Sequence, residues 1–356
     1  MKISIIGLGL IGGSIAKGLK GHDQSIWISG YDNAEVLNKA FVQNVIDKKL
    51  NSIEESVNSD IIFLCLPLEH SLSAFDKIIL LLNDGTILTD VCGIKGIFES
   101  KWNTNSSKGF YIGGHPMTGK EKGGYENSDP LLFENAVYIL SDTNKETGKA
   151  KQLVDLLKLL GSRITYLNPY LHDKVVAKVS HLPQLLSVGL VNSTIKGIEN
   201  VNPLDFAAGG FRDMTRIASS DFNIWKEVLN LNKQEILSAL NSLQNEIDDI
   251  RRCLLNGTSD KLNDMFNSAS EKRDEIPKNT KGFVSPLYDV FVFVNDVPGI
   301  ISRLSAALFN AGINIKDMEL LKIREGTGGT FRLSFESEGD VLKAKEILTS
   351  IGFTIN

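Results

Sequence analysis

The chain has 356 residues, of which 42% are hydrophobic and 23% are charged. This is an ordinary globular balance, and at about 150 residues per domain the length predicts two or three domains. The formal net charge of -5 excludes a general attraction to nucleic acid or to an anionic membrane, so an anionic substrate must be met by local basic groups.

The first part of the chain alternates short apolar runs with helical spacing. Strands are expected at Lys2–Ile6, Ser25–Tyr31, Ile61–Leu66, Thr86–Val91, Phe110–Gly113 and Ala136–Leu140. Helices are expected at Gly12–Lys20, His70–Leu82 and Glu146–Leu160. This alternation predicts a doubly wound α/β domain with a parallel sheet, which we place at residues 1–167.

A glycine-rich motif, GxGxxG, joins the first strand to the first helix through Gly7, Gly9 and Gly12. Glycines in this place permit a tight turn and let the backbone approach a pyrophosphate at the helix N-terminus. A turn without a ligand is the competing interpretation, but the flanking strand and helix favour a dinucleotide-binding, Rossmann-type domain. The predicted cofactor contacts are Gly7, Gly9, Leu10, Ile11, Gly12, Asp32, Leu66, Pro67 and Asp90.

Asp32 ends the second predicted strand. Its carboxylate is expected to accept hydrogen bonds from the adenosine ribose and to repel a 2′-phosphate. The motif therefore favours NAD over NADP.

The middle of the chain, from Tyr170 to about Phe266, has almost only helical patterns, among them Ile224–Leu229 and Lys233–Ile250. We expect an all-helical domain at residues 168–280, with long apolar faces that favour a homodimer. The polar segment Ser268–Pro286 is interpreted as a linker.

Residues 287–356 change character again. Strands are expected at Asp289–Val294, Ile313–Ile315, Glu319–Arg324, Thr330–Glu336 and Phe353–Ile355. Helices are expected at Ile300–Asn310 and Asp340–Ile351. The order βαββαβ is the ferredoxin-like plan.

The three cysteines form no CxxC pair and are too few for a disulfide scaffold, which favours a reducing compartment and hence the cytoplasm. The five histidines include no HExxH pair, so no metal site is expected. No apolar run approaches the roughly 20 residues that span a bilayer, and glycines interrupt the apolar run at the N-terminus, so neither a membrane helix nor a signal peptide is expected.

Four segments have no evident structural reason. They are Thr89–Lys95, Gly113–Glu121, Ser180–Gln184 and Gly209–Ala218. The first follows a strand at the carboxyl edge of the predicted sheet, where ligands bind in open α/β folds.

Together with GLGLIGGS at the start, these segments resemble the prephenate and arogenate dehydrogenases, and GGHPMTGKEKGG and GGFRDMTRIA are the most specific features. The resemblance covers roughly residues 1–280 and implies a Rossmann domain followed by a helical dimerisation domain. The segment DVPGIISRLSAALFNAGINI resembles an ACT domain, a module that binds amino acids and regulates biosynthetic enzymes.

The resemblance implies a prephenate dehydrogenase that reduces NAD in tyrosine biosynthesis. In it, His115 would be the base or hydrogen-bond acceptor for the ring hydroxyl, which suits imidazole because its ordinary pKa lies near neutrality. Arg216 would bind a substrate carboxylate, for which guanidinium is a bidentate partner. The competing interpretations are a loop-capping histidine and a surface ion pair. Glu121 would orient or gate the substrate.

Further substrate contacts are expected from Gln184, His181, Asp213, Trp225 and Lys95. His181 is equally compatible with a buried structural histidine. Two departures affect specificity: many members have serine where Gly93 stands, and many read HLPH where this chain has Gln184. By resemblance to ACT domains, an aromatic amino acid such as tyrosine would bind at Asp296, Pro298, Gly299 and Asn314.

Two alternatives stay open. The enzyme could act on arogenate, in which an amine replaces the side-chain keto group, or the chain could be a non-catalytic sensor of NAD and amino acids. A generic hydroxy acid dehydrogenase accounts for the cofactor motif but not for the histidine and arginine segments.

Overall fold

The computed structural model describes residues 1–120, 122–196, 201–275, 287–324 and 328–355. It divides into two compact units, Met1–Asn263 and Asp264–Asn356, and each is described by itself. None of the helices in the described ranges is long and apolar enough to cross a membrane.

The first unit begins with a parallel sheet of six strands in the order β3-β2-β1-β4-β5-β6. The strands are β1 (Lys2–Ile6), β2 (Trp27–Tyr31), β3 (Lys48–Lys49), β4 (Ile61–Leu64), β5 (Ile87–Asp90) and β6 (Phe110–Tyr111). β4 and β5 are buried at every residue, as expected for parallel strands covered on both faces. The strand order reverses between β1 and β4, and ligands bind at the carboxyl ends of the strands at such a point.

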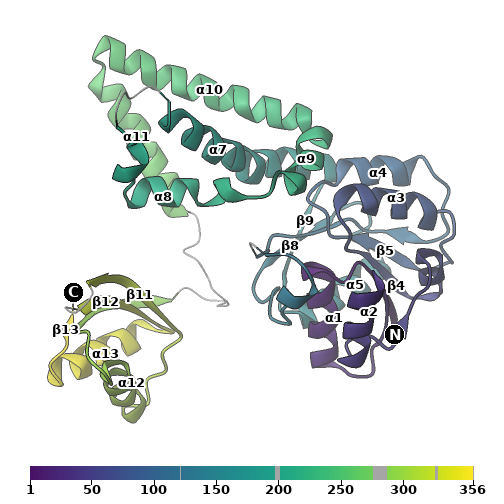
Figure 1. Ribbon diagram of the computed structural model, residues 1–356, viewed down its shortest axis with the longest axis horizontal. Helices are drawn as coiled ribbons and strands as arrows, with labels where there is room; N and C mark the ends of the chain where they lie inside the picture. Colours follow the sequence, from purple (N-terminus) through teal and green to yellow (C-terminus); the bar gives the residue numbers. More distant parts are fainter. Residues whose placement is uncertain (121, 197–200, 276–286, 325–327, 356) are drawn as a thin grey trace. The chain divides into compact units, whose positions relative to one another are not determined.

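Helices cover both faces of this sheet (Figure 1). They are α1 (Leu10–His22), α2 (Ala34–Val42), α3 (Leu68–Ile78), α4 (Gly96–Asn103) and α5 (Gly148–Leu159), with the short 3-10 turn η1 (Ile53–Asn58). Alternate residues of β1 enter different cores: Ile5 packs with α1 and α5, whereas Ile6 packs with α3 and α4. The predicted doubly wound domain is confirmed.

A second, three-stranded sheet follows, which the sequence did not indicate. It contains β7 (Gly114–Pro116), β8 (Val137–Ser141) and β9 (Arg163–Leu167) in that order. β7 pairs antiparallel with β8, and β8 pairs parallel with β9. β7 carries His115, so this sheet positions the predicted base. The short turn η2 (Tyr125–Asn127) lies between β7 and β8.

The rest of the first unit is helical, as expected. It contains α6 (Pro169–Val176), a π-helical turn η3 (Ala177–His181), α7 (Leu182–Thr194), η4 (Pro203–Phe206), α8 (Gly209–Thr215), η5 (Arg216–Ser219), α9 (Phe222–Leu231) and α10 (Lys233–Asn256). The left-handed residue Gly257 ends α10, and α11 (Ser259–Glu275) follows it. The predicted linker Ser268–Pro286 is therefore wrong for residues 268–275, because a solvated helix of polar residues has the same composition as a linker.

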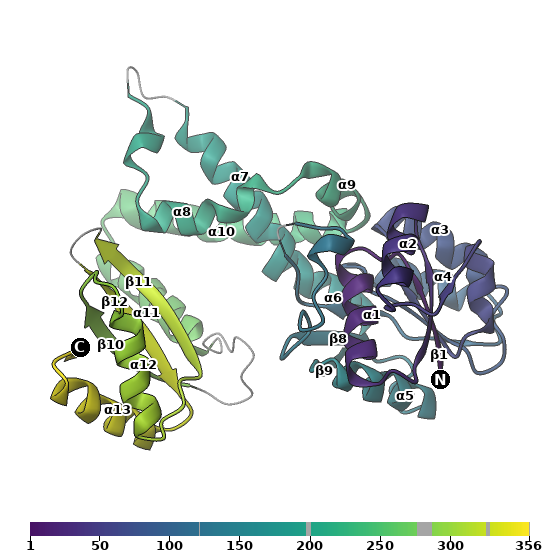
Figure 2. The same cartoon turned by 60° about the horizontal axis from the view of Figure 1, so that its bottom comes forward.

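The C-terminal unit contains a four-stranded antiparallel sheet of order β11-β12-β10-β13. Its elements are β10 (Tyr288–Val294), α12 (Ile300–Asn310), β11 (Asp317–Arg324), β12 (Gly328–Phe335), α13 (Glu338–Ser350) and β13 (Thr354–Ile355). Both helices pack their apolar residues on one face of the sheet (Figure 2). The ferredoxin-like plan is confirmed.

One strand of the C-terminal prediction is wrong. Ile313–Ile315 is not a strand, because the Ile313 N–H bonds to the Leu308 carbonyl at 2.9 Å and closes the end of α12. Strand pairing starts only at Asp317. The apolar character of Ile313 reflects burial in the core rather than a strand of its own.

Candidate functional site

The glycine-rich turn between β1 and α1 has the geometry that its sequence predicts. Gly7 has a φ of +96°, and a Cβ on it would stand 2.6 Å from the Cys65 carbonyl oxygen. A Cβ on Gly12 would stand 1.9 Å from the Gly7 carbonyl oxygen, so the helix can begin only with glycine there. A Cβ on Gly9 would meet nothing within 4 Å. Protein backbone thus packs against the turn at Gly7 and Gly12, whereas the space next to Gly9 is free of protein atoms.

Asp32 holds this turn in place. One carboxylate oxygen accepts the Leu8 N–H at 2.7 Å and the other accepts the Asn33 N–H at 2.7 Å. No side chain caps the N-terminus of α1, so its first N–H groups, including those of Leu10 and Ile11, face the open side of the turn. An open helix N-terminus with a carboxylate beside it fits the pyrophosphate and ribose of NAD.

Three other predicted cofactor contacts follow the ends of β4 and β5. Leu66 is half-buried and Pro67 is exposed. Asp90 is fully buried, and its carboxylate accepts hydrogen bonds from the Tyr111 hydroxyl at 2.7 Å and the Cys92 N–H at 2.9 Å. It also pairs with the Lys95 ammonium. Protein donors therefore occupy both oxygens of Asp90, which holds the loop after β5.

Lys95 is buried with 2% of its surface exposed, and its ammonium lies 5.2 Å from the centre of the Phe98 ring. Its ion pair with Asp90 anchors the loop after β5. Its side chain points toward Asp90, and its contact with substrate stays a prediction.

His115 lies on β7, half-buried, with its Nδ1 2.8 Å from Nε2 of His172. The two rings meet edge to face, with centres 5.0 Å apart. The other nitrogen, Nε2, lies toward Gly93, where an added Cβ would be 3.7 Å from it. Loss of hydration holds the pKa of His115 well below its ordinary value, and His172, Lys95 and His181 lower that pKa further. The imidazole is therefore a neutral base near pH 7.

Asp173, on α6, receives hydrogen bonds from three directions. Oδ1 lies 2.8 Å from His172 Nδ1 and accepts the Lys95 N–H at 2.8 Å, and Oδ2 accepts the Gly96 N–H at 2.8 Å. Its backbone carbonyl accepts the Asn232 amide at 2.9 Å. One residue thus connects the loop after β5, the partner of His115 and the helix α10.

His181 is buried at the end of the π-helical turn, 3% exposed. Its Nδ1 accepts a hydrogen bond from Asn232 Nδ2 at 3.2 Å, which leaves the proton on Nε2. Burial lowers the pKa of His181 to about 4, although Asp173 opposes the shift. Its ring meets the Trp225 ring edge to face at 6.0 Å. His181 is therefore a neutral group with a donor N–H.

Gln184 connects α7 to the segment that carries the predicted arginine. Its amide nitrogen donates to the Ile217 carbonyl at 2.9 Å, and its amide oxygen accepts the Ser220 hydroxyl at 3.4 Å. Arg216 begins η5 directly before Ile217 and is exposed, as is Asp213 on α8. Glu121 lies outside the described residues. Contacts through His172, Asp173 and Asn232 thus link His115, His181, Trp225 and Lys95 in one network, and Gln184 holds the start of η5 against α7.

The residues predicted to bind an effector lie in the C-terminal unit. Asp296, Pro298 and Gly299 form the exposed turn before α12, and Gly299 has a φ of +82°. Asn314 is exposed in the segment between α12 and β11. The turn of Asp296, Pro298 and Gly299 therefore precedes α12, whereas Asn314 follows its C-terminal end.

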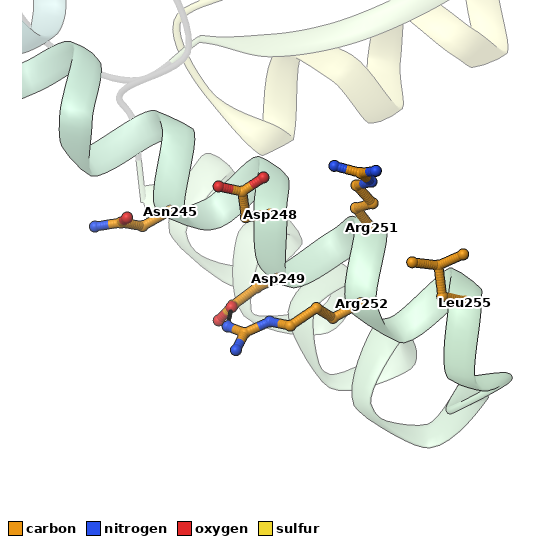
Figure 3. Close-up of a pocket in the computed structure, with 6 residues that line it drawn as sticks. All are labelled: Asn245, Asp248, Asp249, Arg251, Arg252 and Leu255. Atoms are coloured by element: carbon orange, nitrogen blue, oxygen red, sulfur yellow. Dashed lines mark ion pairs between the residues drawn. The ribbon is translucent and has the colours of Figure 1, made fainter.

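A surface hollow elsewhere, on α10, has no catalytic character. Its lining residues Asn245, Asp248, Asp249, Arg251, Arg252 and Leu255 all come from this one helix (Figure 3). Asp249 and Arg252 form an ion pair with each other. Within the described ranges, no group of three histidine, cysteine or acidic residues is placed to hold a metal ion. The cysteines Cys65, Cys92 and Cys253 are free, and burial raises the pKa of Cys92 to about 12, which makes it a poor nucleophile.

A glycine-rich turn of the nucleotide-binding type at the carboxyl edge of a doubly wound sheet, with a neutral histidine facing the loop after β5, is the arrangement of an NAD-dependent dehydrogenase. The comparisons with known proteins agree. The nucleotide-binding domain of prephenate dehydrogenase matches residues 15–166, its dimerisation domain matches residues 168–268, and an ACT domain matches residues 288–353.

Individual relatives give the same result. A prephenate dehydrogenase of Bacillus subtilis is 35% identical over 97% of this chain and 95% of its own. The crystal structure of the Aquifex aeolicus prephenate dehydrogenase with hydroxyphenyl propionate and NAD+ is 29% identical, with a TM-score of 0.70 over 78% of this chain and 98% of its own. The Synechocystis arogenate dehydrogenase is 27% identical, with a TM-score of 0.69 over 77% of this chain and 99% of its own.

The chain therefore belongs to the prephenate dehydrogenase family. As a member it is an NAD-dependent oxidoreductase of tyrosine biosynthesis that carries a C-terminal ACT domain.

Three residues of the site were missed by the sequence analysis: His172, Asp173 and Asn232. No motif marks them. The adjacent pair His172 and Asp173 at the start of a helix was the available signal, since a carboxylate beside a histidine is a common way to orient an imidazole. Nothing in the local sequence pattern places that pair next to His115, which lies 57 residues before His172.

Proposed function

We propose that the protein converts prephenate to 4-hydroxyphenylpyruvate, with His115 as the base. The observation that carries the proposal is the neutral imidazole of His115, held at Nδ1 and turned with Nε2 toward the loop after β5. In such an imidazole, Nε2 is free to accept a proton.

The reaction removes a proton and a hydride from the same alcohol. The ring hydroxyl gives its proton to Nε2 of His115, and the carbonyl forms as the hydride leaves the ring carbon. The ring carboxylate departs as carbon dioxide, its bonding electrons make the ring aromatic, and the former carbonyl oxygen takes back the proton from His115 to give the phenol. NAD, when bound at the turn that contains Gly7, Gly9 and Gly12, supplies the hydride acceptor.

The protein's part is to orient the substrate and to hold the proton acceptor ready. Arg216 would hold a carboxylate of the substrate by paired hydrogen bonds. His181 would donate its Nε2–H, since Asn232 fills its other nitrogen. Trp225 lies against His181 and would limit the ring pocket. Gln184, Asp213, Lys95 and Glu121 stay predicted as weaker contributors.

The test is the appearance of NADH absorbance when the protein is mixed with NAD and prephenate. We expect turnover that His115→Asn lowers by about 100-fold or more, because general-base catalysis contributes about 10²–10⁴. Unchanged turnover in that variant would refute the base assignment.

Arogenate is the second candidate substrate, supported by the similarity to the Synechocystis arogenate dehydrogenase. The two substrates differ in the side chain, where arogenate has an ammonium group that needs acceptors. The same assay with arogenate in place of prephenate decides between them by the ratio of kcat/KM. A protein that binds NAD but oxidises neither substrate would be the non-catalytic sensor.

The helical domain would form a homodimer with a second copy of this chain, as its match to a dimerisation domain suggests. Large apolar side chains are exposed on it, among them Phe206, Met214, Phe222 and Ile224. Exposed patches of this kind mark interfaces. A monomeric mass in light scattering at micromolar concentration would count against the dimer.

The ACT domain would bind an aromatic amino acid, such as tyrosine, at the turn of Asp296, Pro298 and Gly299 with Asn314, and lower the activity. Deletion of residues 287–356 should abolish feedback inhibition by tyrosine and leave basal turnover in place. Equal inhibition of the shortened and full chains would refute this. The cytoplasm is the proposed location, in keeping with three free cysteines.

A further inference from the structure

Two buried groups, His172 and Asp173, extend in a chain behind the proposed base. His172 lies between His115 and Asp173, 2.8 Å from each, and its surface is fully buried. Asp173 is 8% exposed and also accepts the backbone N–H groups of Lys95 and Gly96. The order along the chain is carboxylate, imidazole, imidazole.

The carboxylate fixes the protons of both rings. An ionised carboxylate only accepts hydrogen bonds, so Nδ1 of His172 must carry a proton and donate a hydrogen bond to Asp173. In neutral His172, Nε2 then has no proton and can only accept a hydrogen bond. The 2.8 Å contact between His172 Nε2 and His115 Nδ1 therefore requires His115 to donate from Nδ1. It follows that Nε2 of His115 is the unprotonated nitrogen.

We propose that Asp173 and His172 are positioning residues that hold His115 in the tautomer with its proton on Nδ1, so that Nε2 is always ready as the base. The proposal rests on the proposed role of His115. Without the pair, an imidazole tautomer with the proton on Nε2 would compete, and that form cannot accept the hydroxyl proton.

The tautomer assignment takes His172 as neutral, with a single ring proton. Its ion-pair partner is Asp173, and two backbone N–H groups already donate to that carboxylate. His181 lies on the other side and is neutral near pH 7. A buried imidazolium would need a full counter-charge, and Asp173 has instead been shared among three donors.

The same chain acts during the proton transfer. When Nε2 of His115 takes the hydroxyl proton, the ring becomes an imidazolium whose Nδ1–H points at His172. His172 accepts that hydrogen bond, and its own hydrogen bond to Asp173 becomes stronger as a result. Asp173 thereby stabilises the positive charge on His115 without being protonated. The serine protease triad uses its aspartate in this way, and there the asparagine variant lowers kcat by about 10⁴ through the wrong tautomer.

The test compares two variants of similar volume, His172→Leu and His172→Gln, in the full-length protein. Leucine removes the acceptor for Nδ1 of His115, whereas the amide oxygen of glutamine can replace it. Both leave Asp173 bonded to Lys95 and Gly96. We expect kcat with NAD and prephenate to fall by about 100-fold in His172→Leu and to recover by about 10-fold in His172→Gln, with the Kd for NAD unchanged.

The tautomer of His115 separates a positioning role of His172 from a purely structural one, because a structural role alone would leave that tautomer unchanged. Nitrogen-15 NMR of histidine-labelled protein should show the His115 proton on Nδ1 in the natural chain and on Nε2, at least in part, in His172→Leu. A His115 proton on Nε2 in the natural chain would overturn the proposal, as would a folded His172→Leu variant with kcat within about 3-fold of the natural value. If His172→Leu does not fold, the spectrum of the natural chain and the activity of His172→Gln decide. Loss of the base assignment alone would appear differently, as full activity in His115→Asn.

Discussion

Protonation of His181 should destabilise the protein in mild acid, and replacing it with asparagine should remove that effect. The neutral ring is buried, accepts a hydrogen bond from Asn232 and packs on Trp225. A second proton on Nδ1 would break the hydrogen bond from Asn232 and place a charge in a dry site. In His181→Asn, the amide oxygen can still accept from Asn232, but nothing titrates.

The magnitude follows from the lowered pKa. Folding lowers the pKa of His181 from about 6.5 in the unfolded chain to about 4, so the stabilisation is complete above about pH 6.5 and is lost as the pH falls toward 4. At about pH 5 the unfolded ring is almost fully protonated and the folded ring is mostly neutral. Between about pH 7.5 and pH 5, the free energy of unfolding of the first unit should therefore decrease by about 2 kcal/mol through this residue.

Urea unfolding followed by tryptophan fluorescence, at the two pH values, measures this difference. Because His181→Asn also loses the ring contact with Trp225, the comparison is between pH dependences and not between absolute stabilities. His70→Asn is the matched control, since His70 is exposed on α3. An equal pH dependence in the natural chain and in His181→Asn, or titration of the His181 ring near pH 6.5 by NMR, would refute the reasoning.

Four substitutions test the rest of the site. Gly12→Ala should lower Tm and weaken NAD binding by about 10-fold or more, since its Cβ would stand 1.9 Å from a carbonyl oxygen. Gly9→Ala should keep Tm and weaken NAD binding only. If calorimetry finds that the natural protein and both variants bind NAD equally, the cofactor placement is refuted. Gly93→Ser should fold normally and shift the acid limb of kcat/KM to lower pH, because a hydroxyl donating to Nε2 of His115 stabilises the neutral ring; an unmoved limb would contradict it. Arg216→Lys should raise KM for prephenate by about 10-fold or more with little change in kcat, since a lysine cannot form the paired hydrogen bonds; an unchanged KM would remove Arg216 from the substrate site.

Parts of the structure that depend on local pattern could be predicted from the sequence. The glycine-rich turn is one, because Gly12 must be glycine to avoid the Gly7 carbonyl oxygen within the same βα unit. The ferredoxin-like unit is another, since alternating apolar residues in β10 and β12 face one core. The residues that determine each of these two motifs are close together in the sequence.

The second sheet and the histidine chain could not be predicted, because they depend on contacts between distant segments. His115 and His172 are 57 residues apart, and Asn232 is 51 residues from His181. The π-helical turn adds a further difficulty. It inserts an extra residue into the continuous helix of α6 and α7, so that helical spacing alone misplaces His181 relative to Asp173.

The position of Asp173 gives a reason why the two neutral histidines have opposite tautomers. Its carboxylate accepts a hydrogen bond from His172 and so makes Nε2 of His115 an acceptor, whereas its backbone carbonyl accepts a hydrogen bond from Asn232, whose contact with Nδ1 of His181 makes Nε2 of His181 a donor. An alcohol that loses its proton needs an acceptor, and an anionic substrate group needs a donor. Asp173 thus sets the tautomer of His115 through its carboxylate and that of His181 through its backbone carbonyl. A substitution of Asp173 would also break the start of α4, where the same carboxylate accepts two backbone N–H groups. The chemistry of the site is thereby tied to the folding of the loop that carries it.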